Sequence, residues 1–276
     1  MMKKILSIHS TVTVGFVGNS VVGPVLTTLG LDPLLVPTVI LAAHPGYGRR
    51  VGDAVPDQIV GDVLAGLGDM TDIARIAGVI SGYLGSVGQT EAIASFVDSW
   101  RRAGSGVYIL DPVLGDRGRL YLSEELARAM IDRLLPRADI ITPNSFELGF
   151  LAGMSVSDRR TAEAAAQHLV KTRSLQAVIT TGIDDGPDGI GDLLVTGPEE
   201  SIWCGAGGTG QNVAGGGDLL TAILAGQIAS GVPLASAFQL ASRTAQRIIA
   251  ASESPRDLSL LENLDHVAAL TNQADT

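Results

Sequence analysis

Short apolar runs alternate with longer amphipathic segments along most of the chain, and this alternation constrains the fold more than any other feature. Each run ends at a cluster of small or polar residues, which is typical of βαβ units in a parallel sheet. The pattern predicts an α/β fold with a central, mostly parallel sheet flanked by helices on both faces. The expected strands are Ile5–His9, Leu34–Ile40, Gly78–Ser81, Val107–Leu110, Ile140–Thr142 and Ala177–Thr180.

Helical spacing of apolar residues fills the intervals between these strands. The expected helices are Asp57–Gly66, Gln89–Arg102, Ser123–Leu134 and Thr161–Thr172, with Asp57 and Ser123 as N-caps. Near the C-terminus we expect an antiparallel pair, Asp192–Val195 with Glu200–Trp203, and two helices, Leu219–Ile228 and Pro233–Ala251. We expect residues 1–270 to form a single domain, followed by a polar tail at 271–276.

Composition narrows the classes of protein that this chain can represent. A net charge of -10 without a basic stripe argues against a nucleic-acid surface. No apolar run reaches about 18 residues, so we expect no membrane span. Cys204 is the only cysteine, which excludes an intramolecular disulfide and favours a cytoplasmic protein. No sequence motif supports Cys204 as a nucleophile.

Polar residues directly follow the predicted strands. They are Ser10, Ser81-Gly82-Tyr83, Asp111-Pro112, Pro143-Asn144 and Thr181-Gly182. In open α/β sheets, ligands bind in the crevice outside the carboxyl ends of the strands. The sequence therefore predicts that these residues converge on one site.

Three glycines and an aspartate, Gly215 to Asp218, lead directly into a segment with helical spacing. Glycine leaves its N–H accessible and tolerates positive φ, so the run can form an anion-binding nest where a helix begins. Asp218 would then accept a proton from a hydroxyl while the nest holds negative charge on a phosphoryl group. The alternative is a tight turn in which Asp218 caps the helix, and these four residues leave both interpretations open.

Acidic residues beside two of the strand ends form a candidate metal site. Asp111 ends an apolar strand, and Asp116 follows in a glycine-flanked stretch. Glu147 lies in the first turn of a helix that Asn144 or Ser145 caps. Mg²⁺ takes few protein carboxylates and keeps water and phosphate oxygens as its other ligands. The alternatives are turn-forming aspartates and a glutamate that favours the helix dipole.

Ser10, His44 and Tyr83 are candidates for contact with a small ligand. The Ser10 hydroxyl could bind a ring nitrogen or phenolic oxygen, His44 a substrate oxygen, and Tyr83 the face of a flat ring. Each also has an ordinary structural alternative as a turn, cap or packing residue. The four histidines lack metal-ligand spacing, which argues against a zinc site.

Neither G-x-x-x-x-G-K-[ST] nor a strand-linked dinucleotide fingerprint is present in the sequence. The glycine-rich stretch 205–210 lacks a lysine and follows an expected edge strand. It indicates a flexible segment that leads to the glycine nest and could lie against a nucleotide base.

In their order along the chain, these segments resemble the pyridoxal kinase family of the ribokinase-like superfamily. The most specific parts are the S-x-V-x-x-G-x-V-G-N pattern at 10–19 and the run Ser-Gly-Tyr-Leu-Gly-Ser at 81–86. The other matching segments are 44–48, 111–116, 142–148 and 215–218. The correct order of six segments over about 210 residues makes coincidence a poor explanation.

This resemblance implies that ATP phosphorylates the 5′-hydroxymethyl group of pyridoxal, and also of pyridoxine and pyridoxamine. Asp218 would be the base, with Gly215, Gly216 and Gly217 as the anion hole. The vitamin pocket would contain Ser10, His44, Pro45, Gly46, Tyr47 and Tyr83. The ATP side would contain Asp111, Asp116, Asn144, Glu147, Thr181, Cys204, Gly205, Ala206 and Gly207, with Asp111 and Glu147 serving Mg²⁺. A homodimer and a monovalent cation such as K⁺ are also implied.

The chain departs from the family pattern at three places. Gly216 stands where a non-glycine residue is usual, Thr181 where some relatives have a lysine, and the stretch 205–210 is unusually rich in glycine. Two other functions stay open, a hydroxymethylpyrimidine kinase and a catalytically weak vitamin-binding protein. The patterns at 10–19 and 81–86 favour pyridoxal over the pyrimidine, and retention of Asp218 argues against a binding protein.

Overall fold

A computed structural model describes residues 2–197, 200–206 and 213–271 of the chain. Within these residues, nine strands form one sheet in the order β11-β10-β9-β8-β5-β4-β1-β2-β3. The six strands from β9 to β2 in this order are parallel to one another. At the edges, β10 pairs antiparallel with β9 and β11, and β3 pairs antiparallel with β2. Their bounds are β1 Lys4–Val14, β2 Asp32–Ala43, β3 Gly52–Ala54, β4 Ile76–Ser81, β5 Val107–Leu110, β8 Ile140–Ile141, β9 Ala177–Asp184, β10 Ile190–Gly197 and β11 Glu200–Gly205.

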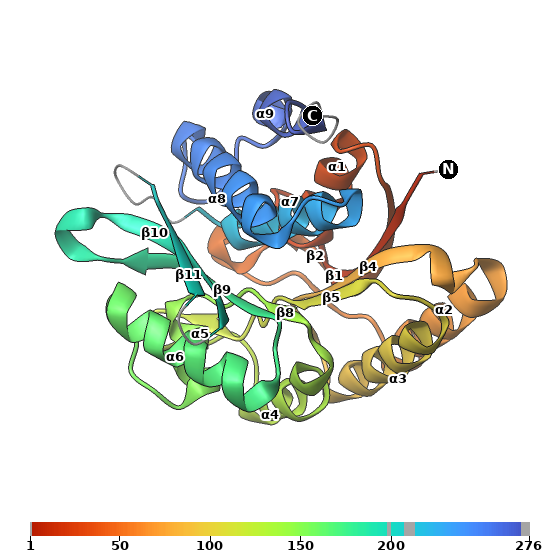
Figure 1. Ribbon diagram of the computed structural model, residues 1–276. Coiled ribbons are helices and arrows are strands. Elements are labelled where there is room, and N and C mark those ends of the chain that lie inside the picture. Colours follow the sequence, from red (N-terminus) through yellow and green to blue (C-terminus); the bar gives the residue numbers. More distant parts are fainter. Residues whose placement is uncertain (1, 198–199, 207–212, 272–276) are drawn as a thin grey trace.

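Helices cover both faces of this sheet (Figure 1). On one face lie α1 Asn19–Thr28, α7 Gly216–Ser230, α8 Leu234–Ala251 and α9 Leu264–Ala268. On the other lie α2 Asp57–Met70, α3 Val87–Ala103, α4 Glu124–Arg133, α5 Ser145–Ala152 and α6 Arg159–Arg173. The expected α/β fold with a mostly parallel sheet is confirmed. None of the helices that the structure describes is long and apolar enough to cross a lipid bilayer.

The hydrophobic core is divided into two layers by the sheet. Successive side chains of a strand point to opposite faces, so Ile5 of β1 packs with α1 and α7 while Leu6 packs with the helices of the other face. Ile80 and Val79 of β4 divide in the same way. Each fully buried side chain of this kind stabilises the fold by roughly 1.5–3 kcal/mol. Burial on both faces is why these strands read as continuous apolar runs.

Several boundaries differ from the sequence predictions. Strand β1 continues to Val14, so Ser10 lies inside the strand, beside a shift in register between His9 and Thr11. The continuation is possible because β2 extends alongside it and pairs with its distal half. Helix α2 begins at Asp57 after Pro56 as N-cap, so the expected Asp57 cap is wrong. Ser123 does cap α4, accepting a hydrogen bond from the Leu126 N–H.

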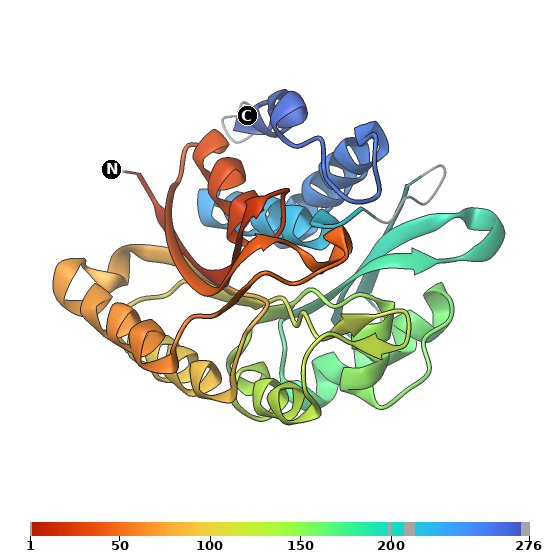
Figure 2. The same ribbon diagram turned by 180° about the vertical axis from the view of Figure 1, so that it is seen from behind.

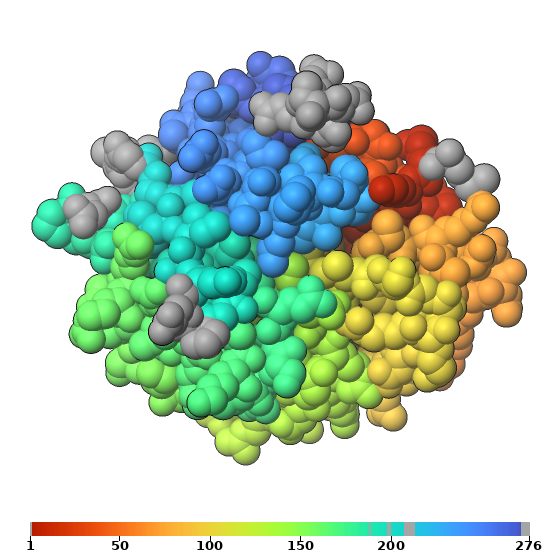
Figure 3. All heavy atoms as spheres, in the orientation of Figure 1, coloured from red at the N-terminus to blue at the C-terminus, as the bar shows by residue number. Residues whose placement is uncertain are grey.

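The loops that follow the parallel strands lie on one side of the molecule. Seen from behind, the turn between β2 and β3 and the small hairpin of β6 Gly115–Asp116 and β7 Arg119–Leu120 come to the front (Figure 2). In the space-filling view, α7 and α8 close over the sheet as a continuous surface (Figure 3). The strand ends therefore open toward loops rather than toward the helical layers.

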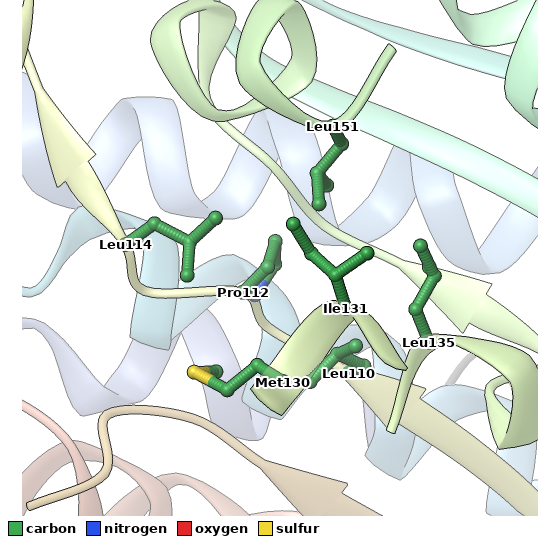
Figure 4. Close-up of a pocket in the computed structure, with 7 residues that line it drawn as sticks. All are labelled: Leu110, Pro112, Leu114, Met130, Ile131, Leu135 and Leu151. Carbon is green, nitrogen blue, oxygen red and sulfur yellow. The ribbon is translucent and has the colours of Figure 1, made fainter. Parts of the chain in front are cut away.

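An apolar pocket lies beneath the loop that leaves β5. Leu110, Pro112, Leu114, Met130, Ile131, Leu135 and Leu151 line it (Figure 4). These side chains come from β5, its following loop, helices α4 and α5 and the 3₁₀ turn after α4, and all are apolar. A phosphorylated ligand needs polar partners, so this pocket is a packing gap rather than a substrate site.

Candidate active site

Backbone hydrogen bonds bring the ends of neighbouring strands to one edge. Gly82 N donates to Ile8 O at 3.1 Å, and Asp111 N donates to Ser81 O at 2.8 Å. Further along the edge, Asn144 pairs with Thr181 in an isolated parallel bridge. The predicted convergence of β1, β4, β5, β8 and β9 is therefore present in the structure.

The strand order separates the candidate residues into two groups. Ser10, the 44–47 loop and Tyr83 belong to or directly follow β1, β2 and β4, which lie in one half of the sheet. Asp111, Asn144, Thr181 and Cys204 belong to or follow β5, β8, β9 and β11, in the other half. The residues assigned to the vitamin and those assigned to ATP thus occupy opposite halves of the same edge.

Asp218 lies in the first turn of α7, and its carboxylate points back to the beginning of the chain. Oδ2 accepts a hydrogen bond from Gly18 N at 2.8 Å, and Oδ1 lies 2.9 Å from His9 Nε2. The N-cap of α7 is Gly215, with φ 90°, and it makes no side-chain cap. The interpretation of Asp218 as the helix cap is therefore wrong, because its carboxylate serves the first βα unit instead.

The three glycines before Asp218 differ in how much space each would leave for a side chain. A Cβ on Gly215 would stand 2.0 Å from Phe16 O, and the positive φ also disfavours any side chain. A Cβ on Gly216 would lie 2.9 Å from Ile249 Cδ1 of α8, whereas one on Gly217 would have no neighbour within 4 Å. A side chain at 216 would require the flexible end of the Ile249 side chain to shift, so the structure limits the space beside Gly216 without requiring a glycine there.

Asp111 is a buried carboxylate with few partners. The Thr221 hydroxyl lies 3.4 Å from its Oδ2, and no lysine or arginine forms an ion pair with it among the described residues. Burial, together with the charges of Asp218 and Glu147, raises the pKa of Asp111 well above its usual range. Possible ligand atoms of His9, Asp111 and Asp218 lie within 4.8 Å of one another. The two carboxylates supply oxygen donors, which are the ligands that a hard ion such as Mg²⁺ prefers.

Glu147 joins two loops through backbone hydrogen bonds. Its Oε1 accepts from Leu114 N at 2.9 Å and Gly115 N at 3.2 Å, and its Oε2 accepts from Asn144 N at 2.9 Å. Asn144 in turn accepts from Glu147 N, which completes a capping box at the start of α5. Burial raises the pKa of Glu147 to about 8. Glu147 therefore orders the loop that carries Asp116.

The 44–47 loop after β2 is fastened to the segment that follows α8. His44 Nε2 lies 2.8 Å from Arg256 O, and the Tyr47 hydroxyl donates to Asp257 Oδ2 at 2.7 Å. Pro45, Gly46 and Tyr47 form a short 3₁₀ turn. Contacts across more than 200 residues of sequence therefore hold this loop beside the strand-end edge.

Ser10 lies in β1, and Tyr83 follows the neighbouring strand β4. Ser10 is buried, and its Oγ is 3.3 Å from His9 Nδ1. Tyr83 follows β4, its carbonyl accepts from Thr38 Oγ1 at 2.6 Å, and its hydroxyl is 3.5 Å from Arg50 Nη1. Both residues thus lie at the half of the edge that also carries the 44–47 loop.

The nucleotide-side residues at the far edge are more dispersed. Asp116 lies in β6 beside Arg117, and Thr181 lies within β9 rather than just past it. Cys204 is buried at the end of β11, and burial raises the pKa of its thiol, which agrees with its interpretation as a non-nucleophile. Ala206 N donates to Ile190 O at 2.7 Å, and Gly205 ends β11. Gly207 lies outside the described residues.

Sequence reasoning missed His9 and Asp192. His9 lies in β1, buried beside Asp218. Burial alone would lower its pKa, but the Asp218 and Asp111 carboxylates outweigh this and raise it. Asp192 of β10 accepts from Gly182 N at 3.0 Å and from Ser242 Oγ at 2.6 Å, which links the end of β9 to α8. In each case the signal was a charged or titratable residue within an apolar strand, which needs a polar partner when buried.

Helix α7 aims the Asp218 carboxylate at the edge of a mostly parallel sheet, beside the buried carboxylate of Asp111, and comparison with known proteins identifies this arrangement as that of a small-molecule kinase of the ribokinase-like fold. Residues 19–259 match the family model described as phosphomethylpyrimidine kinase. The pyridoxal kinase PdxY of Rubrobacter xylanophilus is 33% identical over 89% of this chain and 86% of its own length. A pyridoxine/pyridoxal/pyridoxamine kinase of Bordetella avium is 32% identical over 93% of this chain and 88% of its own. The chain belongs to the pyridoxal kinase family.

Solved structures agree with this assignment. Pyridoxal kinase from Entamoeba histolytica superposes with a TM-score of 0.89 at 27% identity, over 97% of this chain and 96% of that one. Pyridoxal kinase from Leishmania donovani, in complex with ADP and pyridoxamine, gives a TM-score of 0.87 at 29% identity, over 96% and 95%. The expected ribokinase-like fold is therefore confirmed across nearly the whole chain.

Proposed function

We propose that this protein transfers the γ-phosphoryl group of ATP to the 5′-hydroxymethyl group of pyridoxal, and of pyridoxine and pyridoxamine. The observation that carries the proposal is the position of Asp218, at the edge where the two groups of candidate residues meet. The similar proteins named for pyridoxal or for all three vitamers support this choice of acceptor. A hydroxymethylpyrimidine kinase is less well supported: the description of the family model and the name of one solved structure point to it, but that structure holds pyridoxal.

The chemistry follows from a carboxylate beside an anion-binding helix start. As the hydroxymethyl oxygen forms its bond to the γ-phosphorus, its proton passes to the Asp218 carboxylate. The bond between the γ-phosphorus and the β–γ bridging oxygen breaks, and its electron pair leaves with ADP. The backbone N–H groups of Gly215, Gly216 and Gly217 would hold negative charge on the transferring group. Ser10, His44, Pro45, Gly46, Tyr47 and Tyr83 would orient the vitamin.

On the nucleotide side, Asp111 would bind Mg²⁺ directly and Glu147 would reach it through water. When bound, the ion neutralises charge on the phosphates of ATP, which matters here because residue 181 is a threonine. Asp116, Asn144, Thr181, Cys204, Gly205, Ala206 and Gly207 would contact the nucleotide. We further propose a K⁺ requirement, a homodimer, a single domain over residues 1–270 and a cytoplasmic location, which the family resemblance and the lone cysteine favour.

A steady-state assay with Mg-ATP tests this proposal. Pyridoxal, pyridoxine, pyridoxamine and hydroxymethylpyrimidine are supplied separately, and the phosphorylated products are identified by mass. We expect the highest kcat/KM with a vitamin B6 compound. A higher kcat/KM with hydroxymethylpyrimidine would replace the proposed acceptor, and no product from any compound, with pyridoxal still bound, would favour a vitamin-binding protein.

A further inference from the structure

The His9 side chain fills a narrow space, here called the slot, beside Asp218. Two of the residues that border this slot are glycines, and neither has room for a side chain. A Cβ on Gly82 would stand 1.8 Å from His9 Nε2, and a Cβ on Gly18 would stand 2.7 Å from His9 Nδ1. The side chain of His9 is almost fully buried. The imidazole is therefore held between two glycines, one after β4 and one before α1.

The hydrogen bonds of the ring determine where its proton lies. Ser10 N donates to His9 Nδ1 at 2.8 Å, so Nδ1 of the neutral ring acts as an acceptor and carries no proton. In the neutral ring the proton then lies on Nε2, and in the charged ring Nε2 carries a proton as well. His9 thus presents an N–H at Nε2 in either state and cannot itself be the base toward Asp218.

This N–H is directed at the region of the two carboxylates. Nε2 is 2.9 Å from Asp218 Oδ1, yet the contact lacks hydrogen-bond alignment, and Nε2 has no hydrogen-bond partner among the described residues. Asp218 Oδ2 is already held by Gly18 N. A small rotation of the Asp218 carboxylate would satisfy the buried donor and leave both oxygens with one protein contact each.

We infer that His9 is a positioning residue for the reaction, which fixes the Asp218 carboxylate through its Nε2–H while Gly18 N fixes the other oxygen. The inference rests on the proposed function, because it assigns Asp218 as the base. When each oxygen accepts one hydrogen bond, the Asp218 carboxylate keeps a single orientation toward the hydroxyl of the substrate. Such pre-orientation affects kcat rather than the affinity for substrate. His9 does not need to touch either substrate.

The test compares His9→Leu and His9→Gln with the wild type. Leucine fills the slot without a donor, whereas the glutamine amide nitrogen has a reach similar to that of Nε2. We expect His9→Leu to lower kcat at least 10-fold with less than a 3-fold change in KM for pyridoxal or ATP, and His9→Gln to recover most of the loss. His168→Gln, at an exposed histidine of α6, is the matched control.

Gly82→Ala tests the same inference with the histidine still in the chain. Its Cβ displaces the ring, so we expect a similar loss of kcat, and no additional loss when it is combined with His9→Leu. Equal kcat in His9→Leu and the wild type, equal losses in His9→Leu and His9→Gln, or a Gly82→Ala variant with wild-type kcat would each overturn the inference. A wild type that phosphorylates no vitamer would instead overturn the proposed function.

Discussion

The carboxylate of Asp218 gives the sharpest prediction for a single residue. In Asp218→Asn the amide keeps the size of the side chain and can still accept from Gly18 N, but it cannot take up the hydroxyl proton. We expect kcat to fall by roughly 10²–10⁴-fold, the usual contribution of general base catalysis. Pyridoxal binding, followed by its absorbance change, should stay within about 3-fold of the wild type.

Asp69→Asn provides the control, because it removes one negative charge at an exposed position near the end of α2. It should retain the turnover of the wild type. If Asp218→Asn kept more than about a tenth of the wild-type kcat, the proton would have another acceptor.

At the same scale, the sequence predicted the acidic residues but not their contacts. Asp111 and Asp218 stood out because each follows or opens an element with a clear pattern. His9 did not, since a single histidine in an apolar strand has the same pattern as a core residue. Its partner lies more than 200 residues further along the chain, and no local spacing can reveal such a pair.

At the scale of elements, two glycines at the start of α7 should respond differently to substitution by alanine. Gly215→Ala places a side chain at positive φ and 2.0 Å from Phe16 O, so we expect strain of about 1–2 kcal/mol or more. Gly217→Ala meets nothing within 4 Å and gains up to about 1 kcal/mol of helix propensity. Thermal unfolding should show a melting temperature lower by about 2 °C or more for Gly215→Ala, and unchanged or higher for Gly217→Ala. Equal melting temperatures would contradict this account of the helix start.

Most strands were predictable because burial on both faces leaves a continuous apolar run. Helix α1 was not predicted, since it contains Gly23, Pro24 and several valines, which all disfavour helix in isolation. Tertiary contacts outweigh this local preference: Val21, Val25 and Leu26 are fully buried in the layer that α7 shares. The extra length of β1 was missed for a related reason, because its last residues pair with β2 although Thr13 and Val14 are exposed.

For the whole molecule, buried acids set the dependence of stability on pH. Burial is the largest cause that raises the pKa of Asp111, of Glu147 to about 8, and of Asp192. In the unfolded chain the pKa of each of these groups returns to its ordinary value. At a pH between the unfolded and the folded pKa, the folded state therefore binds more protons than the unfolded state. The contribution of these three acids to the stability of the folded state is complete at a pH below their unfolded pKa. It is lost as the pH rises through their folded pKa. Asp98 and Asp158, whose pKa values are lowered, act in the opposite sense but at more acidic pH.

The metal-free protein should therefore become less stable as pH rises from about 5 to about 8.5. Thermal unfolding in the presence of a chelator measures this slope directly. Asp111→Asn removes one of the titrating groups and should melt with a shallower dependence on pH, whereas Asp69→Asn, at an exposed carboxylate, should keep the wild-type slope. A melting temperature that rises with pH over this range, or identical slopes in Asp111→Asn and the wild type, would show that Asp111 is not held protonated by its burial. Because a bound cation favours the charged carboxylate, added Mg²⁺ should flatten the wild-type slope more than that of Asp111→Asn.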